Sequence, residues 1–137
     1  MMRSGYWRLV VAIALAAPIG ACTSPIGIAC TEQPVPSFVV TVVDATSLDP
    51  IGAGSTLSWT GAATGTSSIA ATDTAHNGDA LSGAYEVAGS FQLRVTHAGY
   101  ADWTRAVRIS RDQCHVITGN VTAQMQRVAA TLSATAE

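Results

Sequence analysis

The sequence predicts an all-β protein, a seven-stranded antiparallel β-sandwich that follows a signal peptide. Stretches of alternating apolar and polar residues recur at intervals of about ten residues, with Gly, Asp and Asn turns between them. No segment shows convincing helical periodicity. After residue 21 the chain is rich in Thr, Ser, Ala, Gly and Val, a composition that favours strands around a core of modest side chains.

The N-terminal segment has the pattern of an export signal. Arg3 and Arg8 precede the apolar run Leu9–Ala17. A run of about nine residues is typical of a signal peptide and far shorter than the ~20 residues that a membrane-spanning helix needs. We therefore expect residues 1–21 to be a signal peptide that is removed on export.

The end of this segment, Ile19-Gly20-Ala21-Cys22, resembles the lipobox of bacterial lipoproteins. The resemblance implies cleavage after Ala21 and a lipid on the sulfur of Cys22, which attaches the protein to a membrane and gives it a palmitate-type anchor. Thr23 follows the cysteine in place of the Asp that often marks inner-membrane retention, which favours the outer membrane in a cell with two. The alternative is an ordinary secretory signal that leaves Cys22 as a plain thiol.

Lipidation of Cys22 leaves Cys30 and Cys114 as the remaining thiols. Two cysteines in an exported chain most simply form one disulfide. This bond would close a loop of about 84 residues and stabilise the fold by about 4–5 kcal/mol. It would fasten an extended tether, residues 22–36, to a domain of residues 37–127, with residues 128–137 as a flexible tail.

The first predicted strands differ in pattern. Phe38–Val43 is a nearly continuous apolar run, which indicates a strand buried on both faces or central in a sheet. The segment 44–54 is dense in turn formers. Leu57 and Trp59 then alternate with Ser and Thr, which predicts a half-buried strand, and residues 68–72 form a weaker third strand.

The second half of the chain alternates more clearly. The segment 76–79, HNGD, predicts a hairpin-type turn, because Asn and Gly tolerate positive φ. Strands are predicted over 81–87, 90–97, 103–109 and 116–126. The residues expected to share one face within these strands are Leu81, Gly83, Tyr85 and Val87; Phe91, Leu93, Val95 and His97; Trp103, Arg105, Val107 and Ile109; and Ile117, Val121 and Met125.

Two stretches, VTVVDATSLDPIGAGSTLSW and GAYEVAGSFQLRVTHAGYADWTRAVRI, resemble carboxypeptidase regulatory-like domains. The resemblance covers roughly residues 36–126. It implies a transthyretin-like (prealbumin-like) seven-stranded Greek-key sandwich. The loop SLDPIGAGS departs from the Gly-x-Pro-Val-x-Gly-Ala form that is common in that family, which affects the expected loop geometry more than the fold.

Charge and motifs exclude several classes of function. After residue 21 the chain has five arginines, no lysine and nine acidic residues, a net charge of −4, so no basic patch supports nucleic-acid binding. There is no P-loop, Rossmann glycine pattern or G-x-S-x-G elbow, and we expect no cofactor. His76, His97 and His115 lack zinc-ligand spacing, and His97 is expected to bond backbone groups. Asp44 with Asp49 could form a calcium loop, but turn capping explains both more simply.

Enzymes related to such sandwiches carry features that this chain lacks. It ends Ser133-Ala134-Thr135-Ala136-Glu137, whereas transthyretin-like hydroxyisourate hydrolases end in Tyr-Arg-Gly-Ser. Intradiol dioxygenases bind iron through two tyrosines and two histidines, and neither tyrosine after residue 21 lies near a His-x-His pair. No catalytic residues or metal ligands are therefore predicted.

Tyr100, Trp103 and Arg105 form the candidate binding surface, because these residue types are favoured at binding hot spots. Packing of the aromatic residues in the core is the stronger interpretation, because a core poor in large side chains needs its tryptophans. We therefore expect a non-catalytic, lipid-anchored module of the cell envelope with a structural or binding role. An extracytoplasmic carbohydrate- or peptide-binding protein that uses Tyr100, Trp103 and loop residues is the first alternative, and a divergent enzyme is the second. The partners expected besides the membrane are an envelope protein or a glycan ligand.

Overall fold

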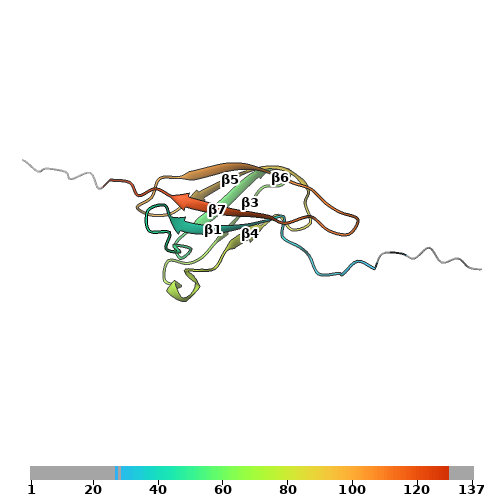
Figure 1. Cartoon of the computed structure of the whole chain (residues 1–137), viewed down its shortest axis with the longest axis horizontal. Helices are drawn as coiled ribbons and strands as arrows, with labels where there is room; N and C mark the ends of the chain where they lie inside the picture. Colours follow the sequence, from blue (N-terminus) through green and yellow to red (C-terminus); the bar gives the residue numbers. More distant parts are fainter. Residues whose placement is uncertain (1–26, 28, 130–137) are drawn as a thin grey trace, which may run out of the picture.

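A computed structural model describes residue 27 and residues 29–129, which form two facing β-sheets (Figure 1). The predicted all-β class is confirmed, and the core lies between the sheets. The predicted signal peptide, the lipidation site Cys22 and residues 130–137 lie outside the described residues.

One sheet contains β4 (Leu81–Gly83), β1 (Phe38–Asp44) and β7 (Gly119–Met125), in that order. The predicted central position of β1 is confirmed. β1 is antiparallel to β4 but parallel to β7. The prediction of a purely antiparallel sandwich is therefore wrong for the β1–β7 pair. Between β1 and β7 the chain forms the strands of the other sheet. It then returns to the first sheet at the end where β1 began, and such a crossover connection makes the two strands parallel.

The second sheet is antiparallel, in the order β3 (Gly65–Ser68), β2 (Thr56–Gly61), β5 (Gly89–Thr96) and β6 (Trp103–Ile109). The predicted alternation is confirmed in β2 and β5, whose apolar residues point inward. The buried residues of these two strands are Leu57, Trp59, Phe91, Leu93 and Val95.

Aromatic rings occupy the centre of the core. The Phe38 ring contacts Trp59 and Phe91 edge-on, at centroid distances of 5.4 and 5.3 Å. The Trp59 indole extends over Gly65 in β3 and Gly83 in β4, where a Cβ atom would lie 2.5 Å from the indole ring. These two glycines therefore leave the space that the largest core side chain needs.

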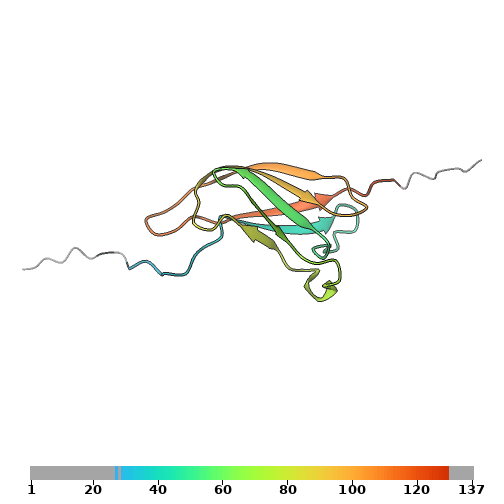
Figure 2. The ribbon, with the colours of Figure 1, turned by 180° about the vertical axis from the view of Figure 1, so that it is seen from behind.

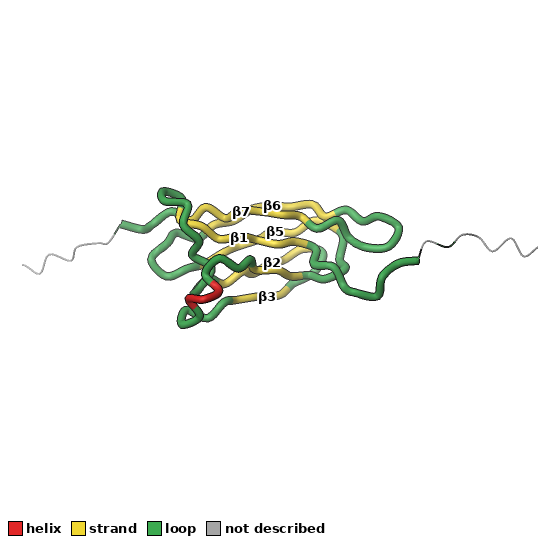
Figure 3. Tube along the Cα trace, turned by 60° about the horizontal axis from the view of Figure 1, so that its bottom comes forward, coloured by secondary structure: helices red, strands yellow, loops and turns green. Residues whose placement is uncertain are grey.

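Two predictions between β3 and β4 are wrong. The third strand begins earlier than expected, at Gly65, and residues 69–72 are not strand. The HNGD segment does not join a hairpin, because β3 and β4 belong to different sheets. Its first residue, His76, is the last residue of a 3₁₀ turn, η1 (Thr74–His76), drawn red in Figure 3. The Asn77 side chain holds this crossover to the preceding loop, with its amide nitrogen donating to the carbonyl of Pro50.

Two predicted strand ends are also wrong. β4 stops at Gly83, because Ala84 and Glu86 adopt φ of +52° and +59°, outside the range of a strand. Tyr85 is therefore exposed and shares no face with Leu81. Ile117 is likewise exposed, since β7 begins only at Gly119.

The loops gather at two ends of the sandwich (Figure 2). The N-terminal arm, residues 29–37, and the β6–β7 loop, residues 110–118, lie at one end. The β5–β6 turn and residues 126–129 lie at the other. The described residues include no helix of the length and apolarity that a membrane crossing requires.

Candidate functional site: the clasp at the arm end

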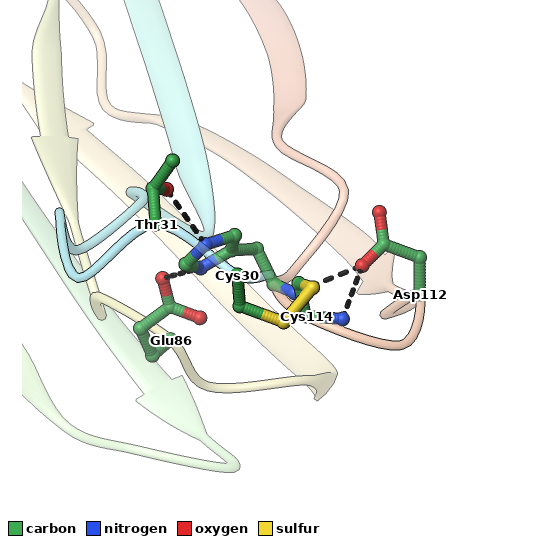
Figure 4. Close-up of a disulfide and its surroundings, with 6 residues drawn as sticks. Cys30, Thr31, Glu86, Asp112 and Cys114 are labelled. Carbon is green, nitrogen blue, oxygen red and sulfur yellow. Dashed lines mark hydrogen bonds and ion pairs between the residues drawn. A yellow bond between two sulfur atoms is a disulfide. The ribbon is translucent and has the colours of Figure 1, made fainter. Parts of the chain in front are cut away.

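The arm is bound to the domain by a disulfide between Cys30 and Cys114, whose Cα atoms are 5.3 Å apart (Figure 4). This is the pairing that the cysteine count predicts. Cys30 precedes β1 and Cys114 lies in the β6–β7 loop, so the bond joins residues separated by 84 positions. We call this disulfide, with the surrounding Thr31, Glu86, Asp112 and His115, the clasp.

Asp112 shapes the loop that presents Cys114 and His115. One carboxylate oxygen, Oδ1, accepts the backbone N–H groups of both residues at 2.8 Å. These two hydrogen bonds, led by that from His115, lower the pKa of Asp112, because they favour its ionised form. The loop is thereby held in a turn that places the cysteine and the histidine against the arm.

His115 connects the arm to the turn after β4. Its Nε2 lies 3.0 Å from the Thr31 hydroxyl, and its Nδ1 lies 2.7 Å from Glu86 Oε1. The same Glu86 oxygen accepts the Val35 N–H at 2.7 Å, and the Glu86 N–H donates to the Val35 carbonyl at 3.0 Å. The Val35 N–H is the main cause of a lowered pKa of Glu86, and His115 adds to it. Glu86 is therefore an ionised acceptor shared by the arm and the histidine.

The residues after Val35 continue this attachment. The Pro36 carbonyl accepts the Thr118 hydroxyl at 2.8 Å. Ser37 is buried, and its hydroxyl donates to the Val87 carbonyl at 2.7 Å, while its backbone carbonyl accepts the Gly119 N–H at 2.9 Å. The predicted tether of residues 22–36 is therefore docked on the domain from Cys30 onward.

The order hydroxyl, imidazole and carboxylate in Thr31, His115 and Glu86 is the order found in nucleophilic hydrolases. Such chemistry also needs N–H donors aimed at a developing oxyanion. The N–H groups of Cys114 and His115 point instead to Asp112. Within the described ranges, no three His, Cys, Asp or Glu side chains gather as a metal site. The contacts of Thr31, His115 and Glu86 thus attach the arm to the domain.

A second polar cluster lies at the opposite end of the sandwich, around the buried Asp44. Asp44 Oδ1 accepts the N–H groups of Thr46 and Ser47 at 2.8 and 3.0 Å. Asp44 Oδ2 accepts the Tyr100 hydroxyl at 2.9 Å and Arg127 Nε at 2.6 Å. The N–H groups of Ser47 and Thr46 are the largest causes of a strongly lowered pKa of Asp44, and Tyr100 and Arg127 add to them.

The contacts of this cluster favour the turn interpretation of Asp44 over a calcium loop at Asp44 and Asp49. Both oxygens of Asp44 already accept two donors each, and one donor is a cation. Asp49 contributes its backbone carbonyl, which accepts the Asp44 N–H at 3.0 Å. Asp44 is therefore a turn residue, as the simpler interpretation predicts.

The candidate binding surface is divided between different environments. Tyr100 is half-buried, and its ring lies 5.4 Å from the Arg127 guanidinium. Burial is the main cause of a raised pKa of Tyr100. Trp103 is half-buried and packs against the core, while Arg105 is exposed. The ring nitrogens of His97 lie 2.8 and 3.0 Å from the backbone carbonyls of Ala98 and Ala53, so the expected bonding to backbone groups is confirmed.

No protein-family model matches the chain, and comparisons with curated proteins and with solved structures found no significant match. Functional inference for this protein therefore depends on its own residues and contacts. Sequence reasoning identified the two cysteines of the clasp but not Thr31, Glu86 and His115. The position of His115 directly after Cys114 was the one local signal that could have indicated its role.

Proposed function

We propose that this protein is a non-catalytic β-sandwich module held at a cell-envelope membrane by a lipid on Cys22, with a structural or binding role there. The observation that carries the proposal is the clasp, which fixes the arm to the domain only eight positions after Cys22. A disulfide persists in oxidising compartments outside the cytosol, which supports export. The lipobox-like sequence before Cys22 supports lipid attachment.

The clasp would limit how far the domain can move from the membrane. Eight residues span at most about 28 Å when fully extended. Without the disulfide and the contacts of residues 31–37, the free length would roughly double. The clasp therefore favours a short connection, which keeps the arm end of the sandwich close to the membrane.

The finer fold proposal is a transthyretin-like Greek-key sandwich of the carboxypeptidase regulatory-like type. The chain path supports it, because β1, β4 and β7 lie in one sheet while β2, β3, β5 and β6 lie in the other. Successive segments thus cross repeatedly between the two layers, as Greek-key connections do.

Ligand binding through Tyr100, Trp103 and Arg105 is the weaker candidate function. The Tyr100 hydroxyl is engaged by Asp44, and Trp103 contacts the core, so neither ring is fully available to a glycan or a peptide. A partner in the envelope would instead meet the exposed loops and strand edges.

The lipid anchor is tested by expressing the full chain and its Cys22→Ala variant with radiolabelled palmitate. Wild type should incorporate the label and enter the detergent phase in Triton X-114 partitioning, whereas Cys22→Ala should do neither. The Cys30→Ala/Cys114→Ala variant is the matched control and should keep the label. Detergent partitioning of Cys22→Ala equal to that of wild type would refute the anchor.

A further inference from the structure

The arginines of the described residues fall into two groups. Arg94 pairs with Asp102, and Arg127 pairs with Asp44. The other three are exposed and form no ion pair within the part of the chain that the structure describes. These three, which we call the arginine row, are Arg105, Arg108 and Arg111.

The arginine row follows one open edge of the four-stranded sheet. β6 is the last strand of that sheet and pairs only with β5. In β6, Arg105 pairs with Leu93 and Arg108 with Ser90. The two arginines are three positions apart, so their side chains leave the strand on opposite faces of the sheet, one on each side of its open edge. Arg111 lies just after the end of β6, in the β6–β7 loop, where it forms an antiparallel β-bridge with Val116.

The strands nearest to the arginine row carry no carboxylate side chains. None of β5, β6 and β7 contains an acidic residue. The nearest acidic residues in sequence lie beyond the ends of β6, where Asp102 pairs with Arg94 and Asp112 accepts two backbone N–H groups. Asp73 and Asp79 lie around η1, in the crossover drawn at the bottom of Figure 1, whereas β6 runs along the top. In the described part of this acidic protein, the exposed arginines without an ion pair thus lie along β6 and just after it, with Asp112 next to Arg111.

We propose that the arginine row binds the anionic phospholipid headgroups of the membrane that holds the Cys22 anchor. This inference rests on the proposed function. The row spans six positions, about 20 Å at ~3.3 Å each, and Arg111 lies at the arm end. Since the eight residues before Cys30 reach at most about 28 Å, the whole row can meet the bilayer surface. Guanidinium groups bind phosphate oxygens in pairs of hydrogen bonds, and the tether keeps the local headgroup concentration high.

The test uses the chain from residue 23 onward, which has no lipid, so that failure of the anchor does not affect the result. This part contains the complete core, which lies between Phe38 and Met125, together with the clasp. Binding is measured by co-sedimentation with vesicles of phosphatidylcholine, with and without 30% phosphatidylglycerol. We expect binding to the anionic vesicles only, with a loss at high salt.

The decisive variant is Arg105→Gln/Arg108→Gln/Arg111→Gln. Each arginine near an anionic surface strengthens binding about fivefold, so the triple variant should bind roughly 100-fold more weakly. The control changes the net charge equally at the opposite edge of the same sheet, at exposed positions. It combines Thr66→Glu and Ser68→Glu on β3 with Ala70→Glu, two positions after that strand. β3 lies three strands from β6, about 14 Å, beyond the ~10 Å screening length at 0.1 M salt.

The control should bind the anionic vesicles nearly as well as wild type. Equal binding by wild type and the arginine variant would overturn the proposal, as would equal losses in the variant and the control. Binding of wild type to an acidic polypeptide such as polyglutamate, but not to vesicles, would overturn it in favour of a protein partner. Absence of vesicle binding together with self-association of the arginine variant would also overturn it, because the row would then only protect an edge strand. Circular dichroism and thiol labelling confirm that each variant is folded.

Discussion

Removal of the disulfide is expected to cause a large loss of stability. For the 84-position separation of Cys30 and Cys114, the chain-entropy relation gives about 15 cal/mol/K, or about 4–5 kcal/mol at room temperature. The Cys30→Ser/Cys114→Ser variant should lose this amount, because its unfolded chain regains the freedom that the crosslink removes. With a urea dependence of about 1.5 kcal/mol per molar, the unfolding midpoint should fall by about 3 M.

Urea titration followed by tryptophan fluorescence measures this change, because Trp59 is buried in the core. Reductant should lower the midpoint of wild type to that of the variant and leave the variant unchanged. A loss below about 1 kcal/mol, or insensitivity of wild type to reductant, would show that the disulfide does not constrain the unfolded chain as argued.

Three further changes test the core and the two polar clusters. Gly83→Ala should lower the free energy of unfolding by about 1–3 kcal/mol, because its Cβ would lie 2.5 Å from Trp59, and thermal unfolding measures the loss. Because the pKa of Asp44 is lowered in the folded protein, its ionised carboxylate stabilises the fold at pH values above about 4, the ordinary pKa of an aspartate. This contribution is lost as the pH falls toward the folded-state pKa. Asp44→Asn should therefore be less stable than wild type at neutral pH and lose less stability in acid, which urea titrations at several pH values measure. Glu86→Ala removes the acceptor of the Val35 N–H and should speed hydrogen exchange there.

Matched controls separate these mechanisms from general effects of substitution. Gly78→Ala adds a methyl group with no atom within 4 Å of its Cβ and should change stability by less than about 0.5 kcal/mol. Asp49→Asn should lose less stability at neutral pH than Asp44→Asn, because Asp49 joins the cluster through its backbone carbonyl, and Glu32→Ala should retain slow exchange at Val35. A destabilisation of Gly78→Ala equal to that of Gly83→Ala would argue against the clash with the indole. Unchanged acid dependence in Asp44→Asn, or unchanged exchange in Glu86→Ala, would argue against the corresponding cluster.

The alternation of apolar and polar residues correctly predicted the strands that have one buried face and one exposed face. Leu57 and Trp59 point inward, as do Phe91, Leu93 and Val95, because burial of one face imposes a period of two. Local patterns failed where the conformation depends on distant partners. The positive φ of Ala84 and Glu86, which ends β4, occurs in residues that rarely adopt it, so nothing in the local sequence indicates it.

The clasp was predictable only in part for the same reason. The predicted export and the cysteine count together predict one disulfide. Thr31 and His115 are 84 positions apart, and Glu86 and His115 are 29 apart, so their contacts exist only once both sheets have formed. The binding surface at Tyr100 was predicted from residue type, which does not reveal that Asp44 binds its hydroxyl.

The parallel pairing of β1 with β7 has a consequence for how the protein acquires its fold. The first strand of the domain has its longest register with the last one, from Phe38 opposite Gly119 to Asp44 opposite Met125. During synthesis, nearly the whole domain must emerge before β7 is available to pair with β1. Contacts so distant in sequence also slow folding, since a large loop must close first. Completion of this domain is thus expected to be a late event, in which the C-terminal strand and the oxidation of Cys114 follow one another closely.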